Sequence, residues 1–161
     1  MRQVVIMIMA IMALSNSAFG EELYMVLNGK AFHQDKGNYN ENNYGLGFEY
    51  DMSTQGAFIP FVGASSFKDS NSQTSNYIGG GYKYRMPLTA KSDGWRFDAG
   101  IMGFVMTRKD YNNNAPFLGA LPFVSFGTGF VMMNATYIPK LTNKGTSLVY
   151  LQLKFRVAEF D

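Results

Sequence analysis

The chain has 161 residues, with 14 Lys and Arg against 12 Asp and Glu, a single His and no Cys. One domain is expected at this length, and zero Cys excludes disulfides, Fe–S clusters and thiolate chemistry. One His without Cys predicts no metal site, and a net charge of +2 without a basic run does not indicate nucleic acid. Aromatic and charged residues each make up 16%, and 17 residues are Gly. This balance indicates a β protein that is not surrounded by water alone.

Residues 1–20 have the pattern of a secretory signal peptide. Arg2 gives a short positive start, residues 4–14 are apolar, and Ala18 and Gly20 occupy the −3 and −1 positions of a cleavage site before Glu21. A retained transmembrane helix is the alternative, but the apolar run is shorter than the ~20 residues of a helical span. We therefore expect export of a domain spanning residues 21–161.

After residue 20 the sequence alternates between apolar and other side chains about eight times, separated by polar turns. The expected strands span residues 22–34, 43–52, 56–67, 76–86, 94–107, 117–127, 129–138 and 146–158. Longer loops at 35–42, 68–75, 108–116 and 139–145 alternate with tighter turns near 53–55, 87–93 and 127–129. This asymmetry predicts an all-β fold, an eight-stranded antiparallel outer-membrane β-barrel.

The last expected strand shows both faces of such a barrel. In residues 148–157 the odd-numbered side chains are apolar, whereas the even-numbered ones are polar or charged from Gln152 onward. In a soluble lipocalin-like carrier the apolar set would fill the interior; in a membrane barrel it faces lipid. The signal peptide and the loop asymmetry favour lipid.

The inward-facing positions predict a polarity gradient inside the barrel. On the fifth strand they change from Arg96 and Asp98 to Met102, Phe104 and Met106. The fourth and eighth strands run in the opposite direction and have their charged residues last, so all three place charges at the same end of the barrel. A half-apolar lumen that ends on charges resembles a socket for a hydrocarbon chain, with its apolar part ending near Gly81. Alternatively, the glycines at 79–81 only let the strand coil in a tight barrel.

Several motifs resemble the lipid A palmitoyltransferases, the PagP family, over most of the chain after residue 20. They are Phe-Lys-Asp-Ser at 67–70, Tyr-Asn-Glu at 39–41 followed by Gly-Leu-Gly-Phe at 45–48, and Leu-Pro at 121–122 followed by Thr-Tyr-Ile-Pro at 136–139. Members of this family are eight-stranded outer-membrane barrels that move a palmitoyl chain from a phospholipid to lipid A and hold the chain inside the barrel. The resemblance implies this activity, with a phospholipid donor, a lipid A or lipopolysaccharide acceptor, no cofactor, and a monomer in the outer membrane of a Gram-negative bacterium.

The resemblance also implies site residues. Asp69 and Ser70 match the family's Asp-Ser pair at the extracellular rim, and Gly81 matches the glycine that limits acyl-chain length. Pro122 and Pro139 match prolines beside a lateral gate, which agrees with the missing proline N–H weakening strand pairing.

The third catalytic residue that the resemblance implies is a His at the end of the first strand. His33 fits with a first loop about seven residues shorter than the family's, whereas alignment on Asp35 and Lys36 puts Gly29 at that position. On the first reading His33 is the general base, Asp69 orients it or binds a headgroup, and Ser70 is a nucleophile or an oxyanion donor.

Two other functions remain open at the level of sequence. A non-enzymatic small barrel, an adhesin or structural protein, would keep the fold without the chemistry. A lipid A deacylase would carry a His-x-Ser signature, but Gln34 and Asp35 follow His33.

Overall fold

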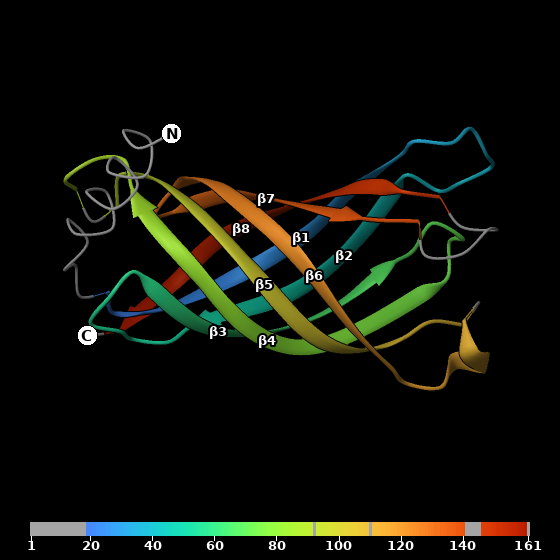
Figure 1. Cartoon of the computed structure of the whole chain (residues 1–161), viewed down its shortest axis with the longest axis horizontal. Helices are drawn as coiled ribbons and strands as arrows, with labels where there is room; N and C mark the ends of the chain where they lie inside the picture. Colours follow the sequence, from blue (N-terminus) through green and yellow to red (C-terminus); the bar gives the residue numbers. More distant parts are fainter. Residues whose placement is uncertain (1–18, 92, 110, 141–145, 161) are drawn as a thin grey trace, which may run out of the picture.

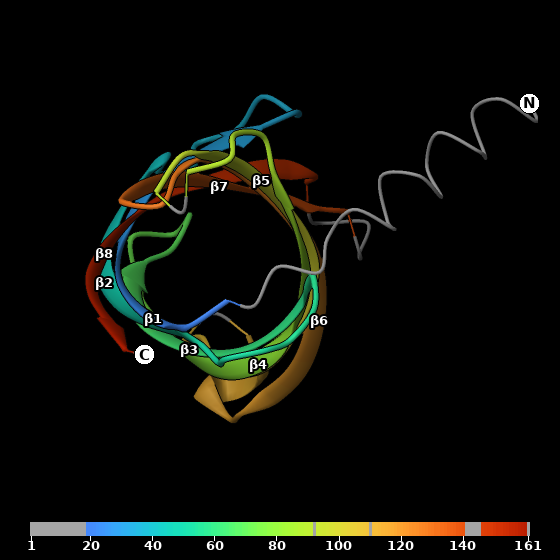
Figure 2. The same ribbon diagram turned by 90° about the vertical axis from the view of Figure 1, so that its left-hand side faces the viewer.

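The structure is a computed structural model that describes residues 19–91, 93–109, 111–140 and 146–160. Its strands are β1 (Glu21–His33), β2 (Asn42–Asp51), β3 (Phe58–Lys68), β4 (Thr74–Pro87), β5 (Trp95–Thr107), β6 (Phe117–Thr128), β7 (Val131–Ile138) and β8 (Leu148–Phe160), with a short 3-10 turn η1 at Asn112–Asn114. They close into one antiparallel barrel in chain order (Figures 1 and 2). The predicted fold is therefore confirmed, with every strand end within two residues of its expected place. The predicted signal peptide, apart from Phe19 and Gly20, lies outside the described residues.

The barrel carries apolar side chains outside and charged side chains inside. Large apolar residues are exposed on the outer face of every strand; examples are Leu46, Phe48, Ile78, Tyr82, Ile101, Leu118, Val124 and Val157. A continuous apolar exterior on this scale indicates contact with something other than water. Among the described residues, no helix is long and apolar enough to cross a membrane.

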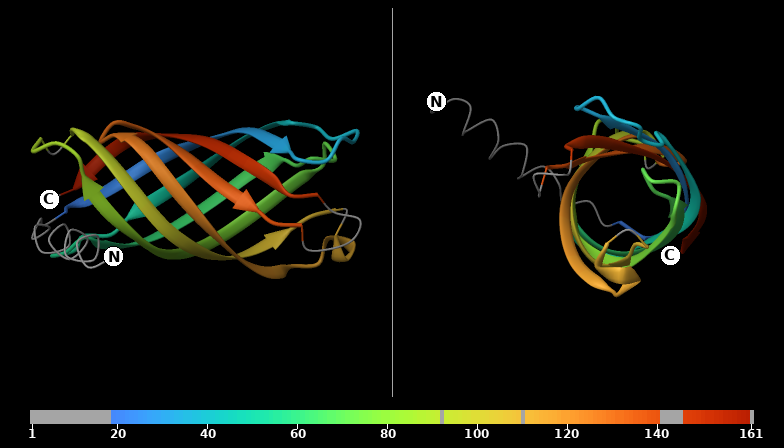
Figure 3. Two further views of the ribbon diagram at one scale, coloured as in Figure 1. Left: turned by 45° about the horizontal axis from the view of Figure 1, so that its top comes forward. Right: turned by 90° about the vertical axis from the view of Figure 1, so that its right-hand side faces the viewer.

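Two connections differ most from the expected pattern: the turn between β2 and β3 spans residues 52–57 instead of 53–55, and the loop after β3 is shorter than expected. Residues 69–73 form only a five-residue loop, because β3 and β4 stay paired as far as Lys68 and Thr74. Within this loop the backbone N–H of its first residue, Asp69, donates to the carbonyl of its last residue, Gln73. Strands β1, β3, β5 and β7 all end at the same end of the barrel (Figure 3), which we call the loop end, and β1 starts at the opposite end.

A network of buried charges fills the lumen near the end at which β1 starts, as the predicted gradient requires. Its buried members among the described residues are the carboxylates Glu22, Glu49, Asp51 and Asp98 and the cations Lys83, Arg85, Arg96 and Lys154. Arg156 joins them at the edge, where it lies 3.0 Å from Glu22. Glu49 Oε1 lies 2.7 Å from Lys83 Nζ and 2.5 Å from Lys154 Nζ. Arg85 reaches Asp51 at 2.8 Å. The ion pairs between these carboxylates and cations are what makes their burial tolerable.

A β-bulge in β1 determines which way the end of that strand faces. Along β8, Asn28 pairs with Gln152 but Ala31 pairs with Tyr150, so Gly29 and Lys30 together face Leu151. Before the bulge the even-numbered residues of β1 point inward; after it the odd-numbered ones do. A Cβ at Gly29 would lie only 2.9 Å from the carbonyl oxygen of Leu151, so glycine suits the close approach.

Candidate active site at the loop end

His33 and Ser70 meet at the mouth of the barrel. His33 is the last residue of β1, and the bulge turns its ring inward, so that Nε2 lies 2.9 Å from Ser70 Oγ. Ser70 sits in the short loop after β3. A hydroxyl within hydrogen-bond distance of an imidazole nitrogen is the arrangement in which serine becomes a nucleophile.

Asp69 makes a different set of contacts from those of a base-orienting acid. Its carboxylate Oδ1 accepts the backbone N–H groups of Asn71 (2.9 Å) and Gln73 (3.0 Å), and Oδ2 accepts the hydroxyl of Ser75 at 2.8 Å. Arg108 Nε lies 3.7 Å from the same Oδ2. Asp69 is 2% exposed and holds the loop that presents Ser70.

The loop after β1 packs over the pair. The ring of Tyr39 stacks on the ring of His33, with centroids 4.3 Å apart and planes within 12°. The backbone N–H of Asn40 donates to the carbonyl of Ser70 at 2.7 Å, and its side-chain amide donates to the carbonyl of Asp69 at 3.1 Å. Neither Tyr39 nor Asn40 was a candidate from sequence as a single residue, although both lie in the motif at 39–41.

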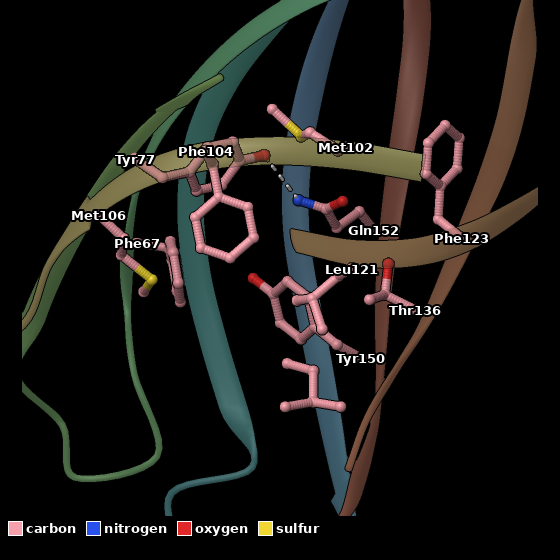
Figure 4. Close-up of a pocket in the computed structure, with 11 residues that line it drawn as sticks. Phe67, Tyr77, Met102, Phe104, Met106, Leu121, Phe123, Thr136, Tyr150 and Gln152 are labelled. Atoms are coloured by element: carbon pink, nitrogen blue, oxygen red, sulfur yellow. Dashed lines mark hydrogen bonds between the residues drawn. The ribbon is translucent and has the colours of Figure 1, made fainter. Parts of the chain in front are cut away.

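An apolar cavity lies in the half of the lumen nearer this pair. It measures about 100 Å³, and its walls come from β3 to β8: Phe67, Tyr77, Met102, Phe104, Met106, Leu121, Phe123, Thr136, Ile138, Tyr150 and Gln152. Figure 4 shows the rings of Phe67, Tyr77, Phe104 and Tyr150 crowding the space between the strands. Gln152 and the hydroxyl of Tyr77, 3.5 Å apart, are polar groups at the boundary with the charged network.

Gly81 faces the lumen where this cavity gives way to charge. It pairs with Met102, a cavity residue, and the next inward position on β4 is the buried Lys83. A Cβ at Gly81 would stand 1.9 Å from the carbonyl oxygen of Ile101, so the position also requires glycine for close strand approach. Both interpretations drawn from the sequence, cavity depth and strand coiling, are compatible with this geometry.

The seam between β6 and β7 is incomplete at the loop end. Its register runs only from Phe123 with Thr136 to Gly127 with Met132, five pairs, whereas the other seams have seven or more. The next pair would be Pro122 with Tyr137, and it is absent. Proline has no N–H to donate there. Pro139 directly follows the last residue of β7.

No cluster of His, Cys, Asp and Glu suited to a metal ion occurs among the described residues. The features that remain are a closed eight-stranded barrel with an apolar exterior, a partly apolar lumen and a Ser–His pair at its mouth. They define a small membrane-type barrel with a serine hydroxyl hydrogen-bonded to an imidazole at its mouth.

Residues 17–153 match the family described as "Antimicrobial peptide resistance and lipid A acylation protein PagP". The chain belongs to this family. It is 32% identical over 133 residues to the lipid A acyltransferase PagP of Yersinia enterocolitica. That match covers 80% of this chain and 64% of the relative's length, slightly less than two thirds.

Proposed function

We propose that this protein is an outer-membrane acyltransferase that moves a palmitoyl chain from a phospholipid to lipid A. The observation that carries the proposal is the 2.9 Å contact between His33 Nε2 and Ser70 Oγ at the mouth of a partly apolar lumen. The name of the Yersinia relative, a lipid A acyltransferase, supports the acceptor. We also propose that residues 1–20 are removed and that the barrel acts as a monomer in the outer membrane of a Gram-negative cell; its apolar exterior supports the insertion.

His33 and Ser70 are the groups that we assign to the chemistry. His33 Nε2 takes the hydroxyl proton of Ser70 as Oγ attacks the ester carbonyl of the phospholipid, and the departing glycerol oxygen receives that proton. A hydroxyl of lipid A then gives its proton to Nε2 and attacks the acyl group on Ser70, whose oxygen regains a proton when the serine is released. One ester replaces another, so neither a cofactor nor an energy source is required. Asp69 contributes by holding the loop of Ser70.

The acyl chain would occupy the apolar cavity and reach toward Gly81. At about 100 Å³ the cavity is smaller than the ~150 Å³ that accommodates a benzene ring, so a sixteen-carbon chain requires the crowding rings to turn aside. The unpaired stretch of the β6–β7 seam beside Pro122 and Pro139 supports sideways entry of the donor. Leu121, Phe123, Thr136 and Ile138 of these two strands line the cavity, so the seam and the cavity adjoin.

The test is mass spectrometry of lipid A from a Gram-negative host that lacks its own palmitoyltransferase and expresses this chain. We expect lipid A to gain one sixteen-carbon acyl chain, and the gain to be absent with Ser70→Ala or His33→Ala. Ser66→Ala, on the exposed face of β3, is the matched serine control and should retain the gain. A gain that persists in Ser70→Ala would contradict the mechanism.

The small cavity favours a second candidate, a barrel that retains the fold without acyl transfer. In that case lipid A keeps its mass while the protein is present in the outer membrane as a folded, heat-modifiable band on gels. The same experiment therefore separates the two.

A further inference from the structure

We infer that Tyr39 is a positioning residue that holds the imidazole of His33 by stacking on the ring face, a support that a Ser-His-Asp triad obtains from a carboxylate at Nδ1. This inference rests on the proposed function for its catalytic consequence. It concerns a residue of the β1–β2 loop that takes no part in the chemistry itself.

The first step concerns the ring nitrogen that faces away from Ser70. In a triad the acid binds Nδ1 and fixes both the ring orientation and the tautomer. Here His33 Nδ1 is buried and has no hydrogen-bond partner among the described atoms. The carboxylate of Asp69 is engaged by Ser75 and the backbone of its own loop. The ring of His33 therefore needs another support.

The second step is the stacking contact. An interplanar angle of 12° at 4.3 Å leaves the imidazole little freedom to rotate out of the plane that points Nε2 at Ser70. Asn40, the residue after Tyr39, donates hydrogen bonds to the backbone of Asp69 and Ser70. These bonds hold the stacking ring and the loop of Ser70 together.

The third step is the space that the Tyr39 ring occupies. A Cβ at Gly37 would lie 2.3 Å from Cε2 of Tyr39, inside the ring's contact radius. Gly37 has no positive φ, so its backbone accepts alanine and only the ring must move. Gly37→Ala is thus a probe that displaces the Tyr39 ring without changing either ring chemically.

The experiment combines activity with a direct view of the histidine. Acyl transfer is compared in detergent-solubilised protein for the parent chain, Tyr39→Phe, Tyr39→Leu and Gly37→Ala, with Gly56→Ala as a control, since nothing lies within 4 Å of a Cβ there. We expect Tyr39→Leu and Gly37→Ala to lower kcat about ten- to a hundredfold, as misplacement of a catalytic group does, with little change in KM. Tyr39→Phe, which keeps the ring, should stay close to the parent.

His33 is the single histidine of the chain, so the untagged protein gives one set of imidazole signals in NMR spectra. The ring protons of His33 should be shifted upfield by Tyr39 in the parent and in Tyr39→Phe, and this shift should vanish in Tyr39→Leu and Gly37→Ala. Parent-like turnover in both Tyr39→Leu and Gly37→Ala, or unchanged imidazole shifts in both, overturns the inference. A parent chain without transfer activity would refute the proposed function, while the NMR comparison would still decide whether Tyr39 sets the ring.

Discussion

His33 and Ser70 are 37 residues apart in the sequence, yet the hydrogen bond between their side chains is 2.9 Å long. Two local features make this contact possible. The bulge at Gly29 and Lys30 turns the end of β1 inward, and the tight loop after Lys68 brings Ser70 back over the mouth. A regular β1 of the same sequence would point His33 at the exterior.

This dependence predicts opposite results for two single-residue deletions. Removing Lys30 makes β1 regular against β8 from Asn28 onward and leaves His33 on the inner face, whereas removing Phe32 keeps the bulge and moves His33 to the outer face. We expect the Lys30 deletion to keep measurable acyl transfer and the Phe32 deletion to lose it. Both should form heat-modifiable barrels, and lipid A mass spectrometry reads the activity. Equal activity in the two deletions would falsify this account of the bulge.

Asp69 should tolerate an amide but not a methyl group. In Asp69→Asn the side-chain oxygen still accepts the N–H groups of Asn71 and Gln73, and the amide nitrogen donates to Ser75, so the loop keeps its shape. Asp69→Ala leaves these buried groups without their partner, which costs about 1–3 kcal/mol and displaces Ser70. The expected order of transfer rates is parent, then Asp69→Asn, then Asp69→Ala near background. If Asn were as inactive as Ala, the charge of Asp69 would act in the chemistry.

A disulfide between β6 and β7 across their unpaired stretch should block entry of the phospholipid donor. Because the chain has no Cys, a pair introduced as Pro122→Cys with Tyr137→Cys gives one defined disulfide across the missing register pair. We expect the oxidised protein to lose transfer and to regain it on reduction. The matched control is Val124→Cys with Ala135→Cys, an existing pair of the same seam, for which oxidation should change nothing. Full activity of the oxidised 122–137 variant would exclude entry through this seam.

Two glycines of the lumen wall should respond differently to alanine. A Cβ at Gly63 would lie 3.2 Å from the carbonyl of Phe48 and 3.7 Å from Cε of Met102, so it needs only a few tenths of an ångström of adjustment in β2 and narrows the cavity beside Met102. A Cβ at Gly81 would collide with the backbone of β5. Gly63→Ala should therefore shift the transferred chains toward shorter lengths in a stable barrel, while Gly81→Ala lowers the urea midpoint of unfolding. Unchanged chain length in Gly63→Ala would mean that the acyl chain stops above Met102.

The charged network should be intolerant of a single uncompensated change. In Glu49→Gln the ammonium groups of Lys83 and Lys154 lose the carboxylate that both contact, and breaking such a buried group costs about 3–5 kcal/mol. Lys68→Gln, at the exposed end of β3, also removes one formal charge, of the opposite sign. It should alter the free energy of unfolding by less than about 0.5 kcal/mol. Urea titration of refolding in detergent micelles measures both. Equal midpoints would show that Glu49 is not required for the network.

The alternation of single strands was enough to predict the barrel, because each strand has one lipid face and one lumen face that the sequence records with period two. The same period predicted that the side chains of Lys83, Arg96 and Lys154 face the lumen. The orientation of His33 was not predictable, since the bulge arises from the register that β1 keeps with β2 and β8 at once. The contacts of Asn40 with Asp69 and Ser70 were hidden for a similar reason, since they join two loops that are distant in sequence.

The pairing of charges inside the lumen, near the end at which β1 starts, has a consequence for the membrane as a whole. A pore needs a continuous column of water, but here buried carboxylates and cations are paired with one another inside the lumen and so need no counter-ions from solution. We therefore expect the barrel to carry no ion current, which recordings across a planar lipid bilayer would measure. A cell could carry many copies without adding a leak to its permeability barrier.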